Sequence, residues 1–208
     1  PLNAIIGFSD MICQMGEEEE KQEYMKIVSS NNELLLQLID DILDLSKIEA
    51  GTMEFTFAPT DINELMEGIC RQMQEKNTSP DVAITFTEKA TECIFHTDRV
   101  RLSQVIINFT NNAMKFTSEG SIQMGYRIDE TKDEIYFYVK DTGIGIPADK
   151  IDEVFERFVK LNTFAKGTGL GLAICRVIVE RLEGTIGANS REGEGSCFWF
   201  RLPMHQKV

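Results

Sequence analysis

The sequence has few basic residues and few cysteines, and each shortage excludes a class of protein. Its 208 residues contain 21 Lys and Arg against 34 Asp and Glu, which gives a formal net charge of −13 at pH 7. A chain this acidic is not expected to bind nucleic acid or an anionic membrane surface. The five cysteines are odd in number and show no C-x-x-C spacing. They therefore indicate reduced thiols in a cytosolic compartment, and not a zinc site or a disulfide framework.

Long hydrophobic runs are also absent. No apolar stretch reaches the roughly 20 residues that a membrane-spanning helix needs, and no signal peptide is visible. The first residue is Pro1 and not Met, so we expect a fragment of a longer protein, with any membrane anchor upstream. The length predicts one or two domains with an ample core.

A predicted strand followed by a glycine turn lies at 134–147. In EIYFYVK (134–140), apolar residues alternate with tyrosines and Lys140, which is typical of a half-buried strand. Asp141 then opens the turn DTGIGIP (141–147). A carboxylate at this point can accept a hydrogen bond from an exocyclic amine such as that of adenine. Gly143 and Gly145, without a Cβ, would let a flat ring approach the backbone.

A second glycine-rich stretch, GTGLGL at 167–172, opens a predicted helix. The helix is indicated by apolar residues at helical spacing: Leu170, Ala173, Ile174, Val177 and Ile178. Gly167, Gly169 and Gly171 would thus place backbone N–H groups at a helix N-terminus, a favourable anion site. Either stretch alone is as often a plain turn as a ligand site; together they predict an adenine clamp and a phosphate cradle.

The third element is a predicted helix at 98–117, capped by Asp98. One side is apolar, with Leu102, Val105, Ile106, Phe109 and Ala113. The other side carries Asn108, Asn111, Asn112 and Lys115, at spacings of three and four. A solvated face is the alternative, but asparagine is a poor helix former. Amide oxygens suit Mg²⁺ carried by phosphates, and a lysine one turn on can neutralise phosphate charge.

These pieces, in this order, resemble the N, G1, F and G2 boxes of the sensor histidine kinases. That family belongs to a larger group of ATPases with Hsp90, the gyrase B subunit and MutL. QVIINFTNNAMKFT (104–117) resembles the N box, DTGIGIP the G1 box, FERF (155–158) the F box and KGTGLGLAI (166–174) the G2 box. The resemblance covers essentially the whole chain. It implies an enzyme that binds ATP and Mg²⁺ and transfers the γ-phosphoryl group to a histidine, for relay to a response-regulator aspartate.

The resemblance also implies which residues form the site. Asn112 would bind Mg²⁺, Asn108 and Lys115 would contact the phosphates, and these three would be the catalytic residues of the chain. Asp141 would read adenine. The full implied nucleotide-binding set is Asn108, Asn112, Lys115, Phe116, Asp141, Gly143, Gly145, Ile146, Lys166, Gly167, Thr168, Gly169, Leu170 and Gly171.

Two features depart from the family pattern. Lys166 stands where many members have the first of two glycines, and only eight residues separate Phe158 from Gly167. Lys166 is either a phosphate contact or a solvated side chain. Phe155, Phe158 and Phe164 lie in this lid region, and we expect them to pack on the body of the domain or on the preceding helices.

Two helices are predicted before residue 50. PLNAIIGFSDMICQM (1–15) has apolar residues at helical spacing, and a turn with an acidic helix start follows at 16–20. The long helix, roughly 20–49, carries a wide apolar stripe: Leu34, Leu35, Leu38, Ile42, Leu45 and Ile48. Such a hairpin normally buries its stripe in a four-helix bundle, here most simply a homodimer. Packing against the following domain is the alternative.

PLNAIIGF resembles the second half of the family's H box, typically His-Glu-x-x-Thr or Asn-Pro. The resemblance places the phosphoaccepting histidine five residues before Pro1. His96 and His205 lie in no such context, so the chain as given is not expected to phosphorylate itself. We expect this fragment to be cytoplasmic, a membrane contact to come only through upstream segments, and the parent to be anchored in a bacterial inner membrane.

We therefore predict an α+β protein of two domains. Residues 1–51 would form an antiparallel helical hairpin, half of a dimeric four-helix bundle, without the phosphoacceptor histidine. Residues 52–208 would form an α/β two-layer sandwich that binds ATP, one sheet backed by helices on one face. Its predicted strands lie at 53–59, 82–89, 92–97, 121–128, 134–140, 184–190 and 195–203, with a further helix at 61–76 capped by Asp61.

Two rival classes are weighed against the kinase. An ATPase clamp of the Hsp90, gyrase or MutL kind is disfavoured by PLNAIIGF and by the long helix before the nucleotide domain. A non-catalytic binding module is disfavoured by the intact residues Asn112, Asp141, Gly143, Gly145 and Gly169. The expected partners are a second copy of the chain and a response-regulator receiver domain.

Overall fold

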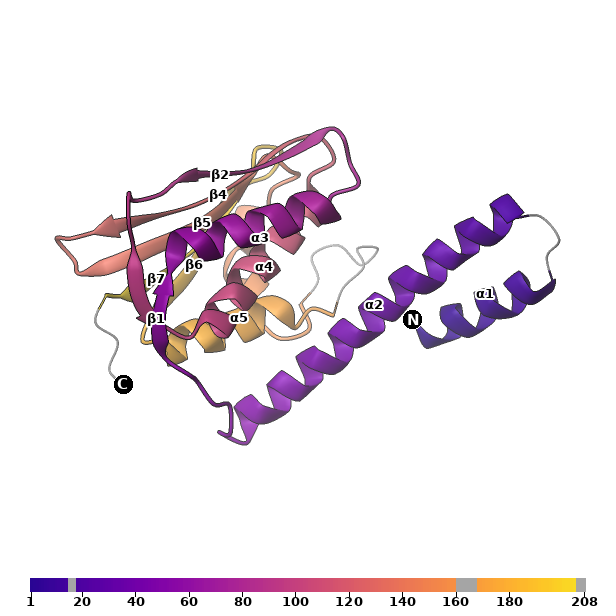
Figure 1. Cartoon of the computed structure of the whole chain (residues 1–208), viewed down its shortest axis with the longest axis horizontal. Helices are drawn as coiled ribbons and strands as arrows, with labels where there is room; N and C mark the ends of the chain where they lie inside the picture. Colours follow the sequence, from indigo (N-terminus) through magenta and orange to yellow (C-terminus); the bar gives the residue numbers. More distant parts are fainter. Residues whose placement is uncertain (15–17, 160–167, 205–208) are drawn as a thin grey trace. The chain divides into compact units, whose positions relative to one another are not determined.

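The computed structural model describes residues 1–14, 18–159 and 168–204, and the chain forms two compact units (Figure 1). The helical unit comprises Pro1–Met53, and the larger unit comprises Glu54–Ala165 together with Gly169–Val208. None of the helices in the described ranges is long and apolar enough to cross a lipid bilayer.

The helical unit is a hairpin of α1 (Leu2–Gln14) and α2 (Glu18–Glu49). Phe8 stacks on Tyr24 with ring centroids 5.3 Å apart, which ties the two helices together. The chain leaves α2 at Gly51, which has a φ of +67°, and the N–H of Thr52 donates to the carbonyl of Lys47 at 2.9 Å. This is the Schellman pattern, in which a glycine adopts the left-handed conformation at no steric cost.

The larger unit contains a five-stranded sheet in the order β2-β4-β5-β7-β6. The strands are β2 (Val82–Glu88), β4 (Gly120–Asp129), β5 (Glu134–Asp141), β6 (Thr185–Arg191) and β7 (Gly195–Pro203). β2 is parallel to β4, and the other neighbours are antiparallel. Because β5 and β7 lie next to each other, the end of β5 meets the start of β7.

Three helices cover one face of this sheet (Figure 1): α3 (Ile62–Lys76), α4 (Arg99–Phe116) and α5 (Gly171–Arg181). Asp61 and Asp98 cap α3 and α4 as predicted. The core between the layers includes Phe109, Tyr126, Phe137 and Phe200, all at most 1% exposed. The structure therefore confirms the prediction of N-terminal helices that are followed in the chain by a two-layer α/β sandwich.

The strand predicted at 53–59 is wrong. Residues 53–57 form no strand, and β1 (Ala58–Asp61) pairs instead with β3 (Ile94–Thr97) in a separate two-stranded sheet. Alternating apolar residues produced the strand-like pattern. The backbone N–H of Thr56, however, donates to the carboxylate of Asp98 at 2.7 Å, so a side chain and not a neighbouring strand satisfies it.

The opposite face of the five-stranded sheet carries aromatic side chains. Trp199 stacks on Tyr136, with centroids 5.9 Å apart, and the Arg127 guanidinium lies 4.8 Å from the Tyr136 ring centroid. The Trp199 ring also fills the space that a Cβ of Gly187 would need. Trp199 thus belongs to the sheet surface.

Candidate nucleotide-binding site

Asp141 is the last residue of β5 and is only 4% exposed. Its Oδ1 atom accepts hydrogen bonds from the backbone N–H of Gly143 at 2.8 Å and of Ser196 at 3.2 Å. Its Oδ2 atom has no hydrogen-bond partner among the described residues. Burial raises the pKa of Asp141, and the two backbone N–H groups oppose this in part. The site therefore holds a desolvated carboxylate with one oxygen available to a donor.

The turn after Asp141 is attached to three other parts of the domain. The N–H of Thr142 donates to Ser121 at the start of β4 (3.1 Å), and that of Ile144 to Phe116 at the end of α4 (3.2 Å). The Ile144 carbonyl accepts from the N–H of Gly193 at 2.8 Å, and the Ile146 N–H donates to the Ser190 hydroxyl at 2.8 Å. These bonds hold residues 141–146, which we call the G1 turn, in one conformation.

Gly143 and Gly145 are required by the protein's own packing. A Cβ on Gly143 would collide with the carbonyl of Phe116, and one on Gly145 would collide with the carbonyl of Arg191. Gly145 also has a φ of +68°, which other residues rarely adopt. The space we expected these glycines to leave for a flat ring is thus occupied on the Cβ side by backbone.

The asparagines of α4 point to different neighbours. Asn108 and Asn112 are half-buried, and Asn108 Oδ1 lies 3.1 Å from where a Cβ of Gly171 would be, so α4 and α5 approach closely there. Asn111 instead accepts from the Lys76 ammonium of α3 at 3.4 Å. Exposed Lys115 holds its ammonium 4.8 Å from the Phe116 ring centroid.

The second glycine stretch opens α5 as predicted. α5 begins at Gly171, and its N-cap residue Leu170 makes no side-chain capping bond. Thr168 directly precedes Gly169, which has a φ of +75°. The carbonyl of Gly169 accepts from the N–H of Phe158 at 2.8 Å. This bond attaches the F-box segment to the glycine stretch. Lys166 and Gly167 lie outside the described residues.

The phenylalanines of the lid region differ from one another. Phe155 is buried and makes an edge contact with Phe198 at 6.1 Å, as expected for a residue that packs on the domain body. Phe158 is 68% exposed, so the prediction that it packs is wrong. Its φ of +63° turns the chain at this point. Phe164, like His205, lies outside the described residues.

Three hydroxyl residues of the site were missed at the sequence level. Ser190 of β6 and Ser196 of β7 pair across the hairpin, and both contact the G1 turn or Asp141. The available signal was Ser196, which takes an inward position in a strand whose next inward residues are Phe198 and Phe200. Thr117 is a third such residue: its hydroxyl is buried without a partner beside Gly143.

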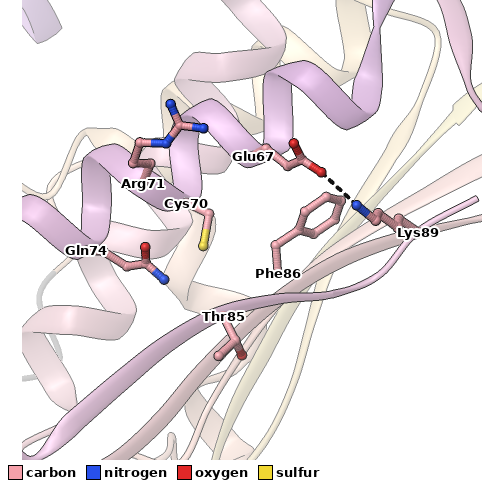
Figure 2. Close-up of a pocket in the computed structure, with 7 residues that line it drawn as sticks. All are labelled: Glu67, Cys70, Arg71, Gln74, Thr85, Phe86 and Lys89. Atoms are coloured by element: carbon pink, nitrogen blue, oxygen red, sulfur yellow. Dashed lines mark hydrogen bonds and ion pairs between the residues drawn. The ribbon is translucent and has the colours of Figure 1, made fainter.

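A hollow of about 410 Å³ lies elsewhere, between α3 and β2 (Figure 2). Glu67, Cys70, Arg71 and Gln74 of α3 line it opposite Phe86, and none of the predicted site residues does. Gln74 and Asn77 donate to the carbonyls of Ile84 and Val82, both at 2.8 Å. α3 thus caps the open edge of β2, which protects the sheet from pairing with another strand.

A metal ion at this site would depend on amide and phosphate oxygens. Within residues 1–14, 18–159 and 168–204, no group of three or more His, Cys, Asp or Glu side chains could hold one. Asn112 and Asn108 present amide oxygens, which are hard ligands suited to Mg²⁺ that arrives already bound to a nucleotide.

The two-layer sandwich, the buried carboxylate and the glycine turns define an ATPase of the kind first indicated by the four boxes. The chain belongs to the family of histidine kinase-, DNA gyrase B- and HSP90-like ATPases, whose sequence model matches residues 97–206. The model of the His Kinase A (phospho-acceptor) domain matches residues 1–51. The two matches confirm the predicted sensor histidine kinase core.

Known proteins with related sequences are sensor kinases. The circadian input-output histidine kinase CikA of Synechococcus elongatus is 36% identical over 98% of this chain and 28% of its own length. The autoinducer 2 sensor kinase/phosphatase LuxQ of Vibrio vulnificus is 33% identical over 99% of this chain and 25% of its own length. The chain therefore spans about a quarter of the length of these relatives.

Solved structures of similar fold are also histidine kinases. Full-length ShkA in complex with AMPPNP is 28% identical, with a TM-score of 0.78 over 100% of this chain and 44% of that one. The histidine kinase ThkA in complex with the response regulator TrrA is 25% identical, with a TM-score of 0.76 over 99% of this chain and 58% of that one.

Proposed function

We propose that the chain is the ATP-dependent core of a sensor histidine kinase, which phosphorylates a histidine for relay to a response regulator. The observation that carries this proposal is Asp141. Its buried carboxylate has one oxygen that accepts from two backbone N–H groups, and the other oxygen has no hydrogen-bond partner in the part of the chain that the structure describes. An acceptor held in this way suits the exocyclic amine of adenine, because a buried charge gains most from a donor that replaces lost water.

In this proposal the remaining residues surround the nucleotide. The adenine end is formed by Asp141, Phe116 and three further residues of the G1 turn: Gly143, Gly145 and Ile146. The phosphates bind at the N-terminus of α5 and in the stretch before it: Lys166, Gly167, Thr168, Gly169, Leu170 and Gly171. Asn108 and Lys115 add phosphate contacts, and Asn112 supplies an oxygen to Mg²⁺. The ion would neutralise phosphate charge during transfer.

The chemistry is transfer of the γ-phosphoryl group from ATP to an imidazole nitrogen, with ADP as the leaving group. Residues 1–51 are proposed as the dimerisation and phosphotransfer hairpin, and residues 52–208 as the ATP-binding domain. The hairpin of residues 1–51 passes the phosphoryl group on through a histidine. This histidine is neither His96 nor His205. A receiver domain of a response regulator then accepts it on an aspartate. The complex of ThkA with a response regulator supports this partner.

Nucleotide binding tests the proposal directly. Titration calorimetry of residues 1–208 should show binding of ATP with Mg²⁺, of ADP and of a non-hydrolysable ATP analogue. Asp141→Asn should weaken ADP binding by roughly tenfold, since a neutral amide replaces a charged acceptor. Asp149→Asn, the same change at an exposed site three residues beyond the G1 turn, should leave the affinity unchanged. No binding heat with any of the three ligands would remove the proposal.

A further inference from the structure

The hydroxyl of Ser190 lies at the centre of a hydrogen-bond network beside the G1 turn. It accepts from the backbone N–H of Ile146 at 2.8 Å, lies 2.8 Å from the carbonyl oxygen of Gly195, and lies 2.9 Å from the hydroxyl of Ser196. Ser196 in turn donates its backbone N–H to Asp141. Ser190 is thus connected both to the G1 turn and to the residue that holds the Asp141 carboxylate.

Counting protons fixes the direction of these bonds. A serine hydroxyl has one proton and two acceptor lone pairs. The carbonyl of Gly195 can only accept, so the Ser190 proton must point to it. The N–H of Ile146 takes one lone pair of Ser190, and the other must receive the proton of Ser196. Ser190 is then fully satisfied, and Ser196 has given its only proton away.

The consequence is that Ser196 can only accept further hydrogen bonds. Its hydroxyl has no other partner among the described residues, and Ser196 is 8% exposed beside Asp141. Asp141 Oδ2 is also an acceptor, and it has no hydrogen-bond partner within residues 1–14, 18–159 and 168–204. Asp141 Oδ2 and the Ser196 hydroxyl therefore offer two acceptors and no proton to the base end of the proposed site, which suits a purine with an amino group at position 6 and repels one with an oxo group there.

We propose that Ser190 is a positioning residue for nucleobase selection, which keeps the Ser196 hydroxyl an acceptor and so favours adenine over 6-oxo purines. This inference rests on the proposed function, because it takes the Asp141 site to be the base pocket. Without the Ser190 hydroxyl, the Ser196 proton has no fixed acceptor. Ser196 can then turn and donate to a 6-oxo group, so discrimination between the two bases should fall.

The test compares Ser190→Val with Ser190→Thr, two side chains of the same shape that differ in the hydroxyl. Titration of residues 1–208 with ADP and with inosine diphosphate gives the ratio of the two dissociation constants. The valine variant should lower the preference for ADP by roughly fivefold, the effect of one hydrogen bond. The threonine variant should keep the wild-type ratio. Thr185→Val, at an exposed hydroxyl on the same strand, is the control and should also keep it.

A second variant tests the same network without changing Ser190. Ser196→Ala removes the oriented hydroxyl and should lower the ratio as Ser190→Val does. The double variant Ser190→Val/Ser196→Ala should lower it no further, because both changes break one relay. If the valine and threonine variants lose affinity for both nucleotides equally, or if the two single effects add, Ser190 is only structural and the inference falls. Selective ADP binding by the wild type would still support the proposed function.

Discussion

At the scale of single residues, Asp141 is placed where its charge is unfavourable until a ligand arrives. Burial raises the pKa of Asp141, although two backbone N–H groups stabilise its ionised form. The folded protein without nucleotide therefore holds a carboxylate that would be more stable in water. A donor at Oδ2 would remove part of this penalty, so the cost of keeping the site ready is recovered on binding.

This cost predicts a gain in stability for Asp141→Asn. A group whose folded-state pKa is raised lowers stability as the pH rises through that pKa. At neutral pH the nucleotide-free asparagine variant should therefore unfold at a higher temperature than the wild type. The shift should be about 2–4 °C for each kcal/mol gained in the free energy of unfolding. The advantage should vanish as the pH falls through the raised pKa, because Asp141 then becomes neutral. Thermal unfolding at several pH values, without nucleotide, measures this. A difference that grows on acidification would contradict the pKa argument.

Asn112 is predicted to matter mainly through the metal. Asn112→Ala removes an amide oxygen from the half-buried side of α4. It should weaken ADP binding in the presence of Mg²⁺ several-fold more than binding in the presence of a chelator. Calorimetric titrations of the wild type and the variant under both conditions give the loss of ADP affinity with Mg²⁺ and the loss with the chelator. Equal losses with and without Mg²⁺ would assign the metal ligand to another residue, of which Asn108 is the first candidate.

At the scale of helices and strands, the sequence predicted most elements because their signals are local. Asp61 and Asp98 cap the helices they were expected to cap, and apolar spacing identified the buried side of α4. The prediction at 53–59 failed because Thr56 bonds to Asp98, a partner 42 residues away. The roles of Ser190 and Ser196 were not predictable for the same reason, since they depend on the pairing of β6 with β7.

The helical unit carries exposed apolar side chains along α2. None of the predicted stripe residues of α2 is fully buried, and Leu36, Ile39 and Leu43 are 62%, 46% and 52% exposed. These three lie at helical spacing on one side of α2. A hairpin with this much exposed apolar surface is expected to associate, and a four-helix bundle would bury it.

Charged substitutions on this side of α2 should therefore separate the proposed dimer. Ile39→Glu combined with Leu43→Glu should convert residues 1–208 from dimer to monomer in sedimentation equilibrium, since each charge would be buried without a partner. Glu33→Gln, at an exposed polar position of α2, is the control and should remain dimeric. A wild-type chain that sediments as a monomer at all accessible concentrations would remove the homodimer from the account.

At the scale of the whole molecule, the nucleotide site is proposed to serve a histidine that is neither His96 nor His205. The match of residues 1–51 to the phospho-acceptor domain supports the proposal that the hairpin belongs to the substrate of the kinase. His96 does not fit that role, because it lies on β3, exposed and stacked on Phe57. The nucleotide domain and its phosphate acceptor are therefore predicted to be separable in experiment.

The most direct test of the kinase assignment is transfer of label from radioactive ATP. A longer form of the protein that includes the predicted H-box histidine before Pro1 should take up label that is labile in acid and stable in alkali, as a phosphoramidate is. Its Asn112→Ala variant and a variant without that histidine should take up none, and neither should residues 1–208 alone. Label on residues 1–208 that His96→Gln removes would contradict the account, because the nucleophile would then lie inside the nucleotide domain.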